Sequence, residues 1–274
     1  PLHVRAPEAS GPLYQAFLQA AEQAGHALHV NTNGAQQEGF SAMDQTIHEG
    51  RRESSATAYL HPVRHRSNLT VHATCPTRRV VMESNRATGI DCLLRGREVR
   101  FHADREVILC AGAINSPKLL MLSGLGPAEH LRQRGIPVAA DLGQVGQNLQ
   151  DHVDVAVMVA CTQPVSMTPA LRWQNKGLVG LRWLLTRSGA ASTNHFEAAG
   201  YVRSAPDSAR ADIQYVFIPV LVMPDGSPLP EPHGYQATAM LMHPASRGSV
   251  DLAGSDPEAA PVVHFNYLRD DRDV

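Results

Sequence analysis

A glycine turn between an apolar run and a helix-like segment is the first feature that could do chemistry. Ala111-Gly112-Ala113 follows an apolar run, and Asn115 and Ser116 stand where the next helix should begin. Glycine lets a backbone approach a large ligand closely, because it has no Cβ. The free amides at the start of a helix attract anions such as a pyrophosphate. Tight packing between a strand and a helix explains the same pattern equally well.

The better-known chemical motifs are absent. The stretch "GLGPAE" at 124–129 has no third glycine, so it is not a G-x-G-x-x-G motif. The sequence contains no H-E-x-x-H metal motif and no G-x-S-x-G nucleophile elbow. The four cysteines form no C-x-x-C pair, which favours a reducing, intracellular setting. We therefore expect no metal site.

The elements that position this turn can be predicted from apolar periodicity. Residues 105–110 are predicted to form a buried strand that leads into a helix over 116–123, and Pro117 is expected in the first helical turn. The other elements expected are helices over 13–24, 50–60, 127–134 and 169–189, strands over 68–73, 78–83 and 87–94, a loop over 31–50, and a strand-rich region after 151.

Composition excludes several classes of protein. The chain has 274 residues, 43% of them hydrophobic, which is enough for one large domain or two smaller ones. The net charge of −2 gives no support to nucleic-acid binding. No apolar run approaches the roughly 20 residues of a transmembrane helix. A peripheral contact with a membrane is left open.

Four segments together resemble one enzyme family. "GAINSPKLLMLSGLG" (112–126) is similar to the second signature of the glucose–methanol–choline (GMC) flavoprotein oxidoreductases, and "GIPVAADLGQVGQNLQDH" (135–152) to the segment after it. "EGFSAMDQTIHEGRRESSATAYL" (38–60) and "HPASRGSVDL" (243–252) resemble an earlier and a later stretch. "SGAASTNHFEAAGYVRS" (188–204), "DIQYVFIPV" (212–220) and "HFNYL" (264–268) look like the bacterial choline-oxidising branch.

The resemblance implies a fold, a cofactor and a reaction. The expected fold is α+β, with part of an FAD-binding domain joined to an antiparallel-sheet substrate domain. The expected divisions are 1–61 for loops and helices over the cofactor, 62–150 for FAD-binding and 151–274 for substrate-binding. Such an enzyme oxidises an alcohol by hydride transfer to FAD. For the choline-oxidising branch the product is betaine aldehyde, and the electrons pass to a respiratory acceptor.

The resemblance also implies cofactor and substrate residues. Ala111, Gly112 and Ala113 match the flavin-side backbone, and Thr77 matches a position near the adenine. For the substrate cation, the matching positions are Asp154 and Trp173, with Glu197 as a second carboxylate. Glu is usual at the position of Asp154, so the shorter side chain weakens the choline assignment. His243 matches a histidine that positions the alcohol in the oxidase branch.

Two parts of the family pattern are missing between residues 1 and 274. The dinucleotide motif is absent, and the catalytic histidine is expected beyond Val274, so no catalytic residue is assigned. The expectation is an internal piece of a cytoplasmic enzyme, with peripheral attachment to the inner membrane as a variant, and with self-association through uncovered apolar surface. Alternatives are an enzyme for an uncharged primary alcohol, a non-catalytic truncated product and, more distantly, a hydroxynitrile lyase.

Overall fold

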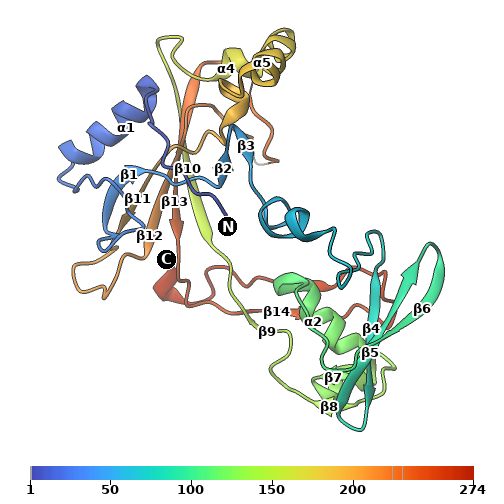
Figure 1. The fold of residues 1–274 in the computed structure, drawn as a ribbon. Helices are drawn as coiled ribbons and strands as arrows, with labels where there is room; N and C mark the ends of the chain where they lie inside the picture. The colour runs from blue at the N-terminus through green and yellow to red at the C-terminus, as the bar shows by residue number, and fades with distance from the viewer. Residues whose placement is uncertain (1, 224, 230) are drawn as a thin grey trace. The chain divides into compact units, whose positions relative to one another are not determined.

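Two compact units make up the chain in the computed structural model, which describes residues 2–223, 225–229 and 231–274 (Figure 1). The first unit comprises residues up to 69 together with 152–242, and the second comprises 70–151 together with 243–274. Each unit has helices and antiparallel sheets. The mixed α+β class predicted from the sequence is confirmed.

A five-stranded antiparallel sheet is the centre of the first unit. Its strand order is β1-β11-β12-β13-β10, and every neighbouring pair is antiparallel. The strands are β1 (Gly39–Ala42), β10 (Val153–Ala160), β11 (Ala198–Val202), β12 (Ile213–Ile218) and β13 (Gly234–Leu241). Strand β10 is an edge strand and is paired with β13 along its whole length. The predicted strand-rich region after 151 supplies four of these five strands.

Helix α1 (Pro12–Gln23) covers part of this sheet. Proline at its first turn needs no hydrogen-bond partner for an amide hydrogen, so it suits a helix start. The buried ring of Tyr14 meets Phe217 of β12 edge-on, with 5.8 Å between ring centroids. Phe17 stacks on the same Phe217 at 4.7 Å. The aromatic face of α1 therefore forms the core with the sheet.

The smaller elements of the first unit are β2 (Ile47–His48), β3 (Arg51–Arg52), the π-helical η1 (Ala56–Leu60), the 3₁₀ turns η2 (His61–Val63) and η3 (Ala190–Ser192), and helices α4 (Thr168–Leu171) and α5 (Trp173–Thr186). The predicted loop over 31–50 is wrong, because it contains β1 and β2. The predicted helix over 50–60 exists only in its last turn. The helix over 169–189 is divided at Arg172, whose backbone is extended.

The second unit has a three-stranded meander and a helical layer. The meander is β4 (Thr77–Glu83), β5 (Arg86–Leu94) and β6 (Arg97–His102). The other elements are α2 (Gly112–Leu122), α3 (Ala128–Gln133), the parallel pair β7 (Leu125–Gly126) and β8 (Ala140–Asp141), the sheet of β9 (Gln147–Leu149), β14 (Gly248–Asp251) and β15 (Val262–His264), and the turn η4 (Asp271–Asp273). Met121, Leu131 and Leu252 are fully buried between α2, α3 and the segment after β14.

Three expectations about this unit are wrong. Residues 68–73 and 105–110 are not strands, and Ile108 is 73% exposed. A strand needs a partner, and no strand in the described part of the chain pairs with either segment. Helix α2 begins at Gly112, so Pro117 lies inside it rather than in its first turn.

The final segment belongs to the second unit. Residues 243–274 were expected to lie with 151–242 in one domain, but they cluster with 70–151. The reason is strand pairing, because β14 is antiparallel to β9 and aligns Gly248 with Leu149. The functional roles expected for the three segments stay predictions.

Candidate cofactor and substrate sites

A cavity of about 640 Å³ in the second unit lies at the start of α2. Its lining includes Thr77 at the start of β4, residues 107–111, and Leu119 and Leu122 on α2. Thr77, predicted near the adenine, and Ala111, predicted on the flavin side, thus line the same cavity although they are far apart in the sequence. The volume is within the range of small-molecule sites, which is about 300–1,000 Å³.

The glycine turn stands exposed at the N-terminus of α2. Gly112 has φ +84°, a left-handed conformation that favours glycine, and a Cβ built on it would meet nothing within 4 Å. No side chain caps the first turn of this eleven-residue helix, although the Ser116 hydroxyl accepts a hydrogen bond from the Ala111 amide at 3.1 Å. The remaining first-turn amides face open space, where an anionic group is stabilised.

Ala113 lines a second cavity. This cavity measures about 330 Å³ and also has Pro117, Asn148 and Gln150 in its wall. Ala111 and Ala113 thus line different cavities, and Gly112 between them has open space at its Cβ position, so tight strand–helix packing does not describe this turn.

These features fit the predicted FAD. A flat ring needs an apolar wall, which Leu119, Leu122 and the exposed side chain of Ile108 provide. A pyrophosphate needs unpaired amides, which the first turn of α2 provides. The space beside Gly112 is open, because a Cβ built on it would meet nothing within 4 Å. Thr77, Ala111, Gly112 and Ala113 are the residues that would hold the cofactor.

A second polar feature of this unit was missed by the sequence reading. Asp91 on β5 accepts hydrogen bonds from Arg100 at 2.7 Å and from Arg79 at 2.7 Å. The bond to Arg100, together with that to Arg79, lowers the pKa of Asp91 to about 2. All three line a further cavity of about 640 Å³ with Arg78. No motif in the sequence links Asp91 with Arg79 and Arg100, because strand pairing brings them together.

In the first unit, Glu197 is the last residue of the loop 193–197, which precedes β11 and is held by hydrogen bonds. The Thr193 hydroxyl donates to Glu197 Oε1 at 2.7 Å, and the buried Gln45 donates to Asn194 Oδ1 at 2.6 Å. The Tyr14 hydroxyl donates to the carbonyl oxygen of His195 at 2.5 Å. Two of these bonds come from distant parts of the sequence, Tyr14 and Gln45, and the third lies within the loop, so the loop is tied to α1 and to the segment after β1.

The negative charge of Glu197 affects the pKa values of two neighbouring residues, Tyr14 and His195. Burial raises the pKa of Tyr14, and Glu197 raises it further. Burial lowers the pKa of His195, which Glu197 opposes. Nδ1 of His195 is buried with no hydrogen-bond partner. Glu197 is therefore a partly buried carboxylate beside two groups that stay neutral at neutral pH.

The other two substrate candidates of this unit lie in the open. Asp154 is exposed on β10, opposite Met240 of β13. Trp173 begins α5 and is 78% exposed. Among the described residues, no hydrogen bond or ion pair joins Asp154, Trp173 and Glu197. Strands β12 and β13 separate β10 from β11, so Asp154 and Glu197 stay separate candidates for the substrate cation.

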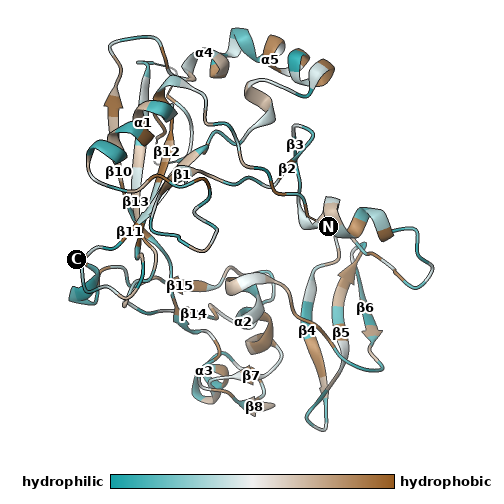
Figure 2. Cartoon of the chain, turned by 60° about the vertical axis from the view of Figure 1, so that its left-hand side comes forward, coloured by the Kyte–Doolittle hydropathy of each residue, from teal (hydrophilic) through white to brown (hydrophobic). Residues whose placement is uncertain are grey.

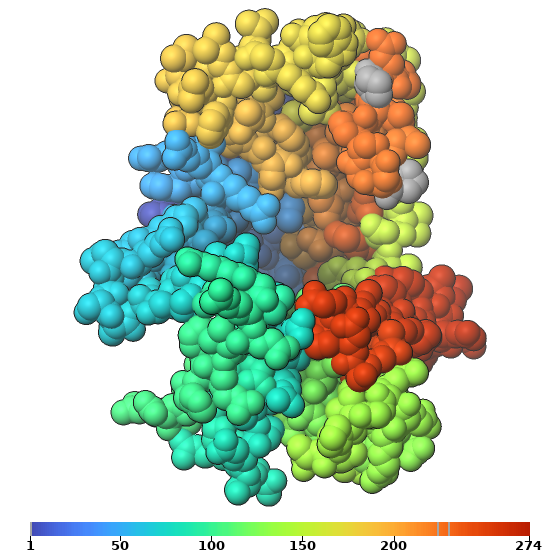
Figure 3. Space-filling model, turned by 90° about the vertical axis from the view of Figure 1, so that its right-hand side faces the viewer, coloured from blue at the N-terminus to red at the C-terminus, as the bar shows by residue number. Residues whose placement is uncertain are grey.

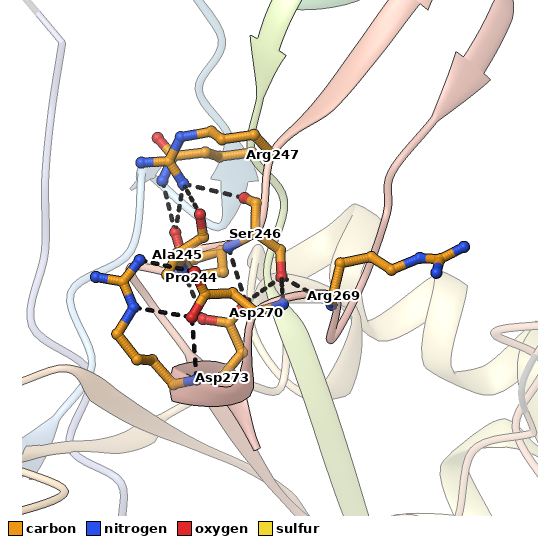
Figure 4. A network of polar contacts seen from close by, with 9 residues as sticks. Pro244, Ala245, Ser246, Arg247, Arg269, Asp270 and Asp273 are labelled. Atoms are coloured by element: carbon orange, nitrogen blue, oxygen red, sulfur yellow. Dashed lines mark hydrogen bonds and ion pairs between the residues drawn. The ribbon is translucent and has the colours of Figure 1, made fainter.

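His243 lies in the second unit, just before a turn that is fixed by polar contacts (Figure 4). The carboxylate of Asp273 accepts hydrogen bonds from the amides of Ala245 at 2.6 Å and Ser246 at 2.9 Å, and from the Ser246 hydroxyl. The same hydroxyl oxygen accepts the amide of Arg269 at 3.0 Å. The bond from Ser246, above all, lowers the pKa of Asp273. The sequence reading missed this network, which joins residues 27 positions apart.

Comparisons with known proteins agree with the resemblance. A family model described as GMC oxidoreductase matches residues 1–154. The chain is 44% identical over 273 residues to the oxygen-dependent choline dehydrogenase of Brucella ovis, covering 100% of this chain and 50% of that protein. It is 45% identical over 274 residues to the mitochondrial choline dehydrogenase of Mus musculus, covering 100% of this chain and 46% of that protein.

A solved structure shows the same arrangement of the chain. The crystal structure of pyridoxine 4-oxidase from Mesorbium loti matches 100% of this chain and 50% of its own, with a TM-score of 0.83 and 28% identity. The chain spans about half the length of the curated relatives it matches. The family model covers more than half of the sequence, and the exposed glycine turn lies within it. The chain belongs to the GMC oxidoreductase family.

Proposed function

We propose that this chain is part of an FAD-dependent enzyme that oxidises choline to betaine aldehyde. Whole-chain identity of 44% to a choline dehydrogenase supports this proposal. Bound FAD supplies the chemistry, because the flavin ring accepts a hydride from the alcohol carbon. The chain's own residues bind and orient the cofactor and the alcohol. Thr77 and the turn Ala111-Gly112-Ala113 hold the cofactor.

The half-buried carboxylate of Glu197 is the structural observation that supports choline as the substrate. A trimethylammonium group donates no conventional hydrogen bond, so it is recognised by negative charge and by aromatic faces. Glu197 is half-buried, and its carboxylate is oriented by Thr193. Tyr14 lies close enough for Glu197 to raise its pKa. Partial burial strengthens the attraction between charges, whereas water weakens it at the exposed Asp154.

The test exchanges each carboxylate for its amide and compares two substrates. Choline and its uncharged isostere 3,3-dimethylbutanol differ only in the charged centre. We expect Glu197→Gln to reduce kcat/KM for choline on the order of 30-fold, with little effect on the uncharged alcohol, because a partly buried charge loses its partner. Asp154→Asn is the matched control on the same sheet and should change both substrates equally.

Each outcome decides between substrates. Equal losses on both alcohols in Glu197→Gln would contradict a cation site at this residue. A selective loss in Asp154→Asn alone would move the site to β10. A wild-type preference for the uncharged alcohol would favour the second candidate, a dehydrogenase for uncharged primary alcohols. The exposure of Trp173 and Asp154 is the observation in favour of that candidate.

Cofactor binding is tested by absorption. Purified chain is mixed with FAD, freed of excess and examined for the flavin band. We expect bound flavin, and we expect Gly112→Ala to lose it. Gly135→Ala is the matched control, because Gly135 also has a left-handed backbone (φ +70°) and open space at its Cβ. If both variants retained equal amounts of bound flavin, the result would contradict cofactor binding at Gly112. Absence of flavin from the wild-type chain would favour a non-catalytic product.

The partners follow from the same proposal. We propose that the electrons pass to a respiratory acceptor at a membrane, and that the protein is cytoplasmic with a peripheral attachment to the inner membrane. No described helix is long and apolar enough to cross a bilayer. Exposed valines on the edge strand β10 support self-association as a further proposal.

A further inference from the structure

Helix α5 carries an uncovered apolar face. None of its 14 residues is fully buried, and Leu178, Leu181, Leu184 and Leu185 are each more than half exposed. At 100° per residue these leucines and Trp173 fall within a sector of about 140° that also contains Gln174 and Gly177. In Figures 1 and 3 the helix is gold and lies at an outer edge of the first unit. Figure 2 shows its apolar residues in brown.

The opposite face fixes α5 to its unit. The indole nitrogen of Trp183 donates to the Gly50 carbonyl oxygen at 2.7 Å. The guanidinium of Arg187 lies over the same ring, 4.3 Å from its centroid. One side of α5 is therefore attached to the first unit through Trp183, and the leucine side is exposed. The leucines are exposed although the helix itself is fixed in place.

The sequence stretch that contains α5 carries charges of one sign. Residues 155–196 contain no Asp or Glu, although the whole chain has 26 acidic residues. The same stretch contains Arg172, Lys176, Arg182 and Arg187. Arg172 pairs with Glu231 at 2.6 Å, and Arg187 covers Trp183. At 100° per residue Arg182 lies about 40° beyond Leu178, and Lys176 lies about 60° beyond Trp173, next to the anchored Trp183.

This combination points to one kind of partner. A leucine and tryptophan face bordered by cations is the pattern of a helix that lies in the interface of an anionic membrane. A second copy docked through the same face would bring cations of one sign together. We propose that α5 inserts its apolar face into the surface of a bilayer that contains anionic phospholipid, with Lys176 and Arg182 at the phosphates.

This inference deepens the proposed peripheral attachment and needs neither choline nor FAD for its test. The chain's two tryptophans, Trp173 and Trp183, are both on α5, on its open and its anchored side. Trp183→Phe leaves Trp173 as the only reporter, and Trp173→Phe leaves Trp183. We expect vesicles of phosphatidylcholine and phosphatidylglycerol to shift Trp173 emission to the blue. Brominated acyl chains should quench Trp173 far more than Trp183.

Two further variants identify the binding face by vesicle sedimentation. We expect Lys176→Glu with Arg182→Glu to weaken binding about tenfold or more, because each near-surface cation contributes about a factor of five. We expect Leu181→Gln with Leu185→Gln to weaken binding about tenfold or more as well, because less apolar surface enters the bilayer. Added salt should act in the same direction. Arg95→Glu with Arg97→Glu, on the exposed β5–β6 turn, is the matched charge control and should bind nearly as wild type.

Three results would overturn the proposal. The first is no binding of the wild-type chain to anionic vesicles. The second is binding that the α5 variants leave unchanged, or equal quenching of both tryptophans. The third is a wild-type dimer without lipid binding that the leucine variant converts to a monomer, which would assign the face to a second copy. A failure of the choline test leaves each of these readings intact, so the two proposals fail separately.

Discussion

At the scale of single residues, two cysteines that line cavities of the second unit are expected to differ in reactivity. Cys92 is 1% exposed, and its thiol lies 3.5 Å from the carbonyl oxygen of Val99. Burial, and then the neighbouring Cys75 thiol, raise the pKa of Cys92 to about 11. Cys110 is exposed in the wall of the cavity beside α2. The thiolate is the reactive form, so the two residues should react at very different rates.

We predict that iodoacetamide at pH 8 labels Cys110 well before Cys92, which should react only after unfolding. Peptide mass spectrometry at increasing times measures both rates in one sample. Cys110→Ser should remove the fast label and leave the slow one. Rapid labelling of Cys92 in folded protein would contradict its burial.

Asp91 is one of the acid-sensitive residues of the second unit. Its pKa of about 2 lies below the unfolded value of about 3.9, so its contribution is complete above that value and is lost as the pH falls toward 2. We predict that Asp91→Asn lowers the free energy of unfolding at pH 6, and that the difference from wild type disappears near pH 2. Urea unfolding at several pH values measures this. Glu98→Gln, in the exposed pair with Arg78, should differ little from wild type throughout. A difference for Asp91→Asn that is constant with pH would contradict the assignment.

At the scale of elements, close packing between strands fixes the sheet of the first unit. Gly200 on β11 lies opposite Phe40 on β1, and a Cβ at Gly200 would come within 2.3 Å of the Phe40 ring. We predict that Gly200→Ala costs about 1–3 kcal/mol of stability through overpacking. Gly177→Ala on α5, with open space around it, should instead add about 0.5–1 kcal/mol. Urea unfolding tests both, and partial recovery in Phe40→Leu with Gly200→Ala tests the cause.

The sequence predicts elements best where local pattern decides them. Periodicity identified α1, the β4–β5 hairpin and the strands after 151, because each has a regular apolar side. It failed at 105–110, where apolar residues line a cavity instead of pairing in a sheet. The hydrogen bonds that hold the loop before Glu197, and those between Ser246 and Asp273, could not be predicted. They join residues that are far apart in the sequence, and no sequence motif links them. Thr77 entered only through the family resemblance.

At the scale of the whole molecule, each unit has a core of its own. Tyr14 and Phe217 are buried in the first unit, and Met121 and Leu131 in the second. The chain passes between the units after residues 69, 151 and 242. Stability therefore need not be shared equally between the units, because each can open without loss of the other's buried contacts.

We predict that destabilisation stays within the unit that is changed. Leu131→Ala should cost about 2–5 kcal/mol and speed amide exchange in peptides from 70–151 and 243–274. Gly200→Ala should speed exchange only in the other unit. Hydrogen exchange followed by mass spectrometry separates the peptides. Equal acceleration in both units would show one cooperative fold.

The pairing of distant strands also sets an order of events during synthesis. Strand β1, at 39–42, pairs with β11 at 198–202, and β9, at 147–149, pairs with β14 at 248–251. A ribosome that adds about 5–20 residues per second must continue for roughly ten seconds before either partner emerges. For that interval the nascent chain carries strands without their pairing partners, and their backbone groups bond to water. An unpaired strand edge can pair with another chain, so this interval is when the chain is most exposed to misassembly.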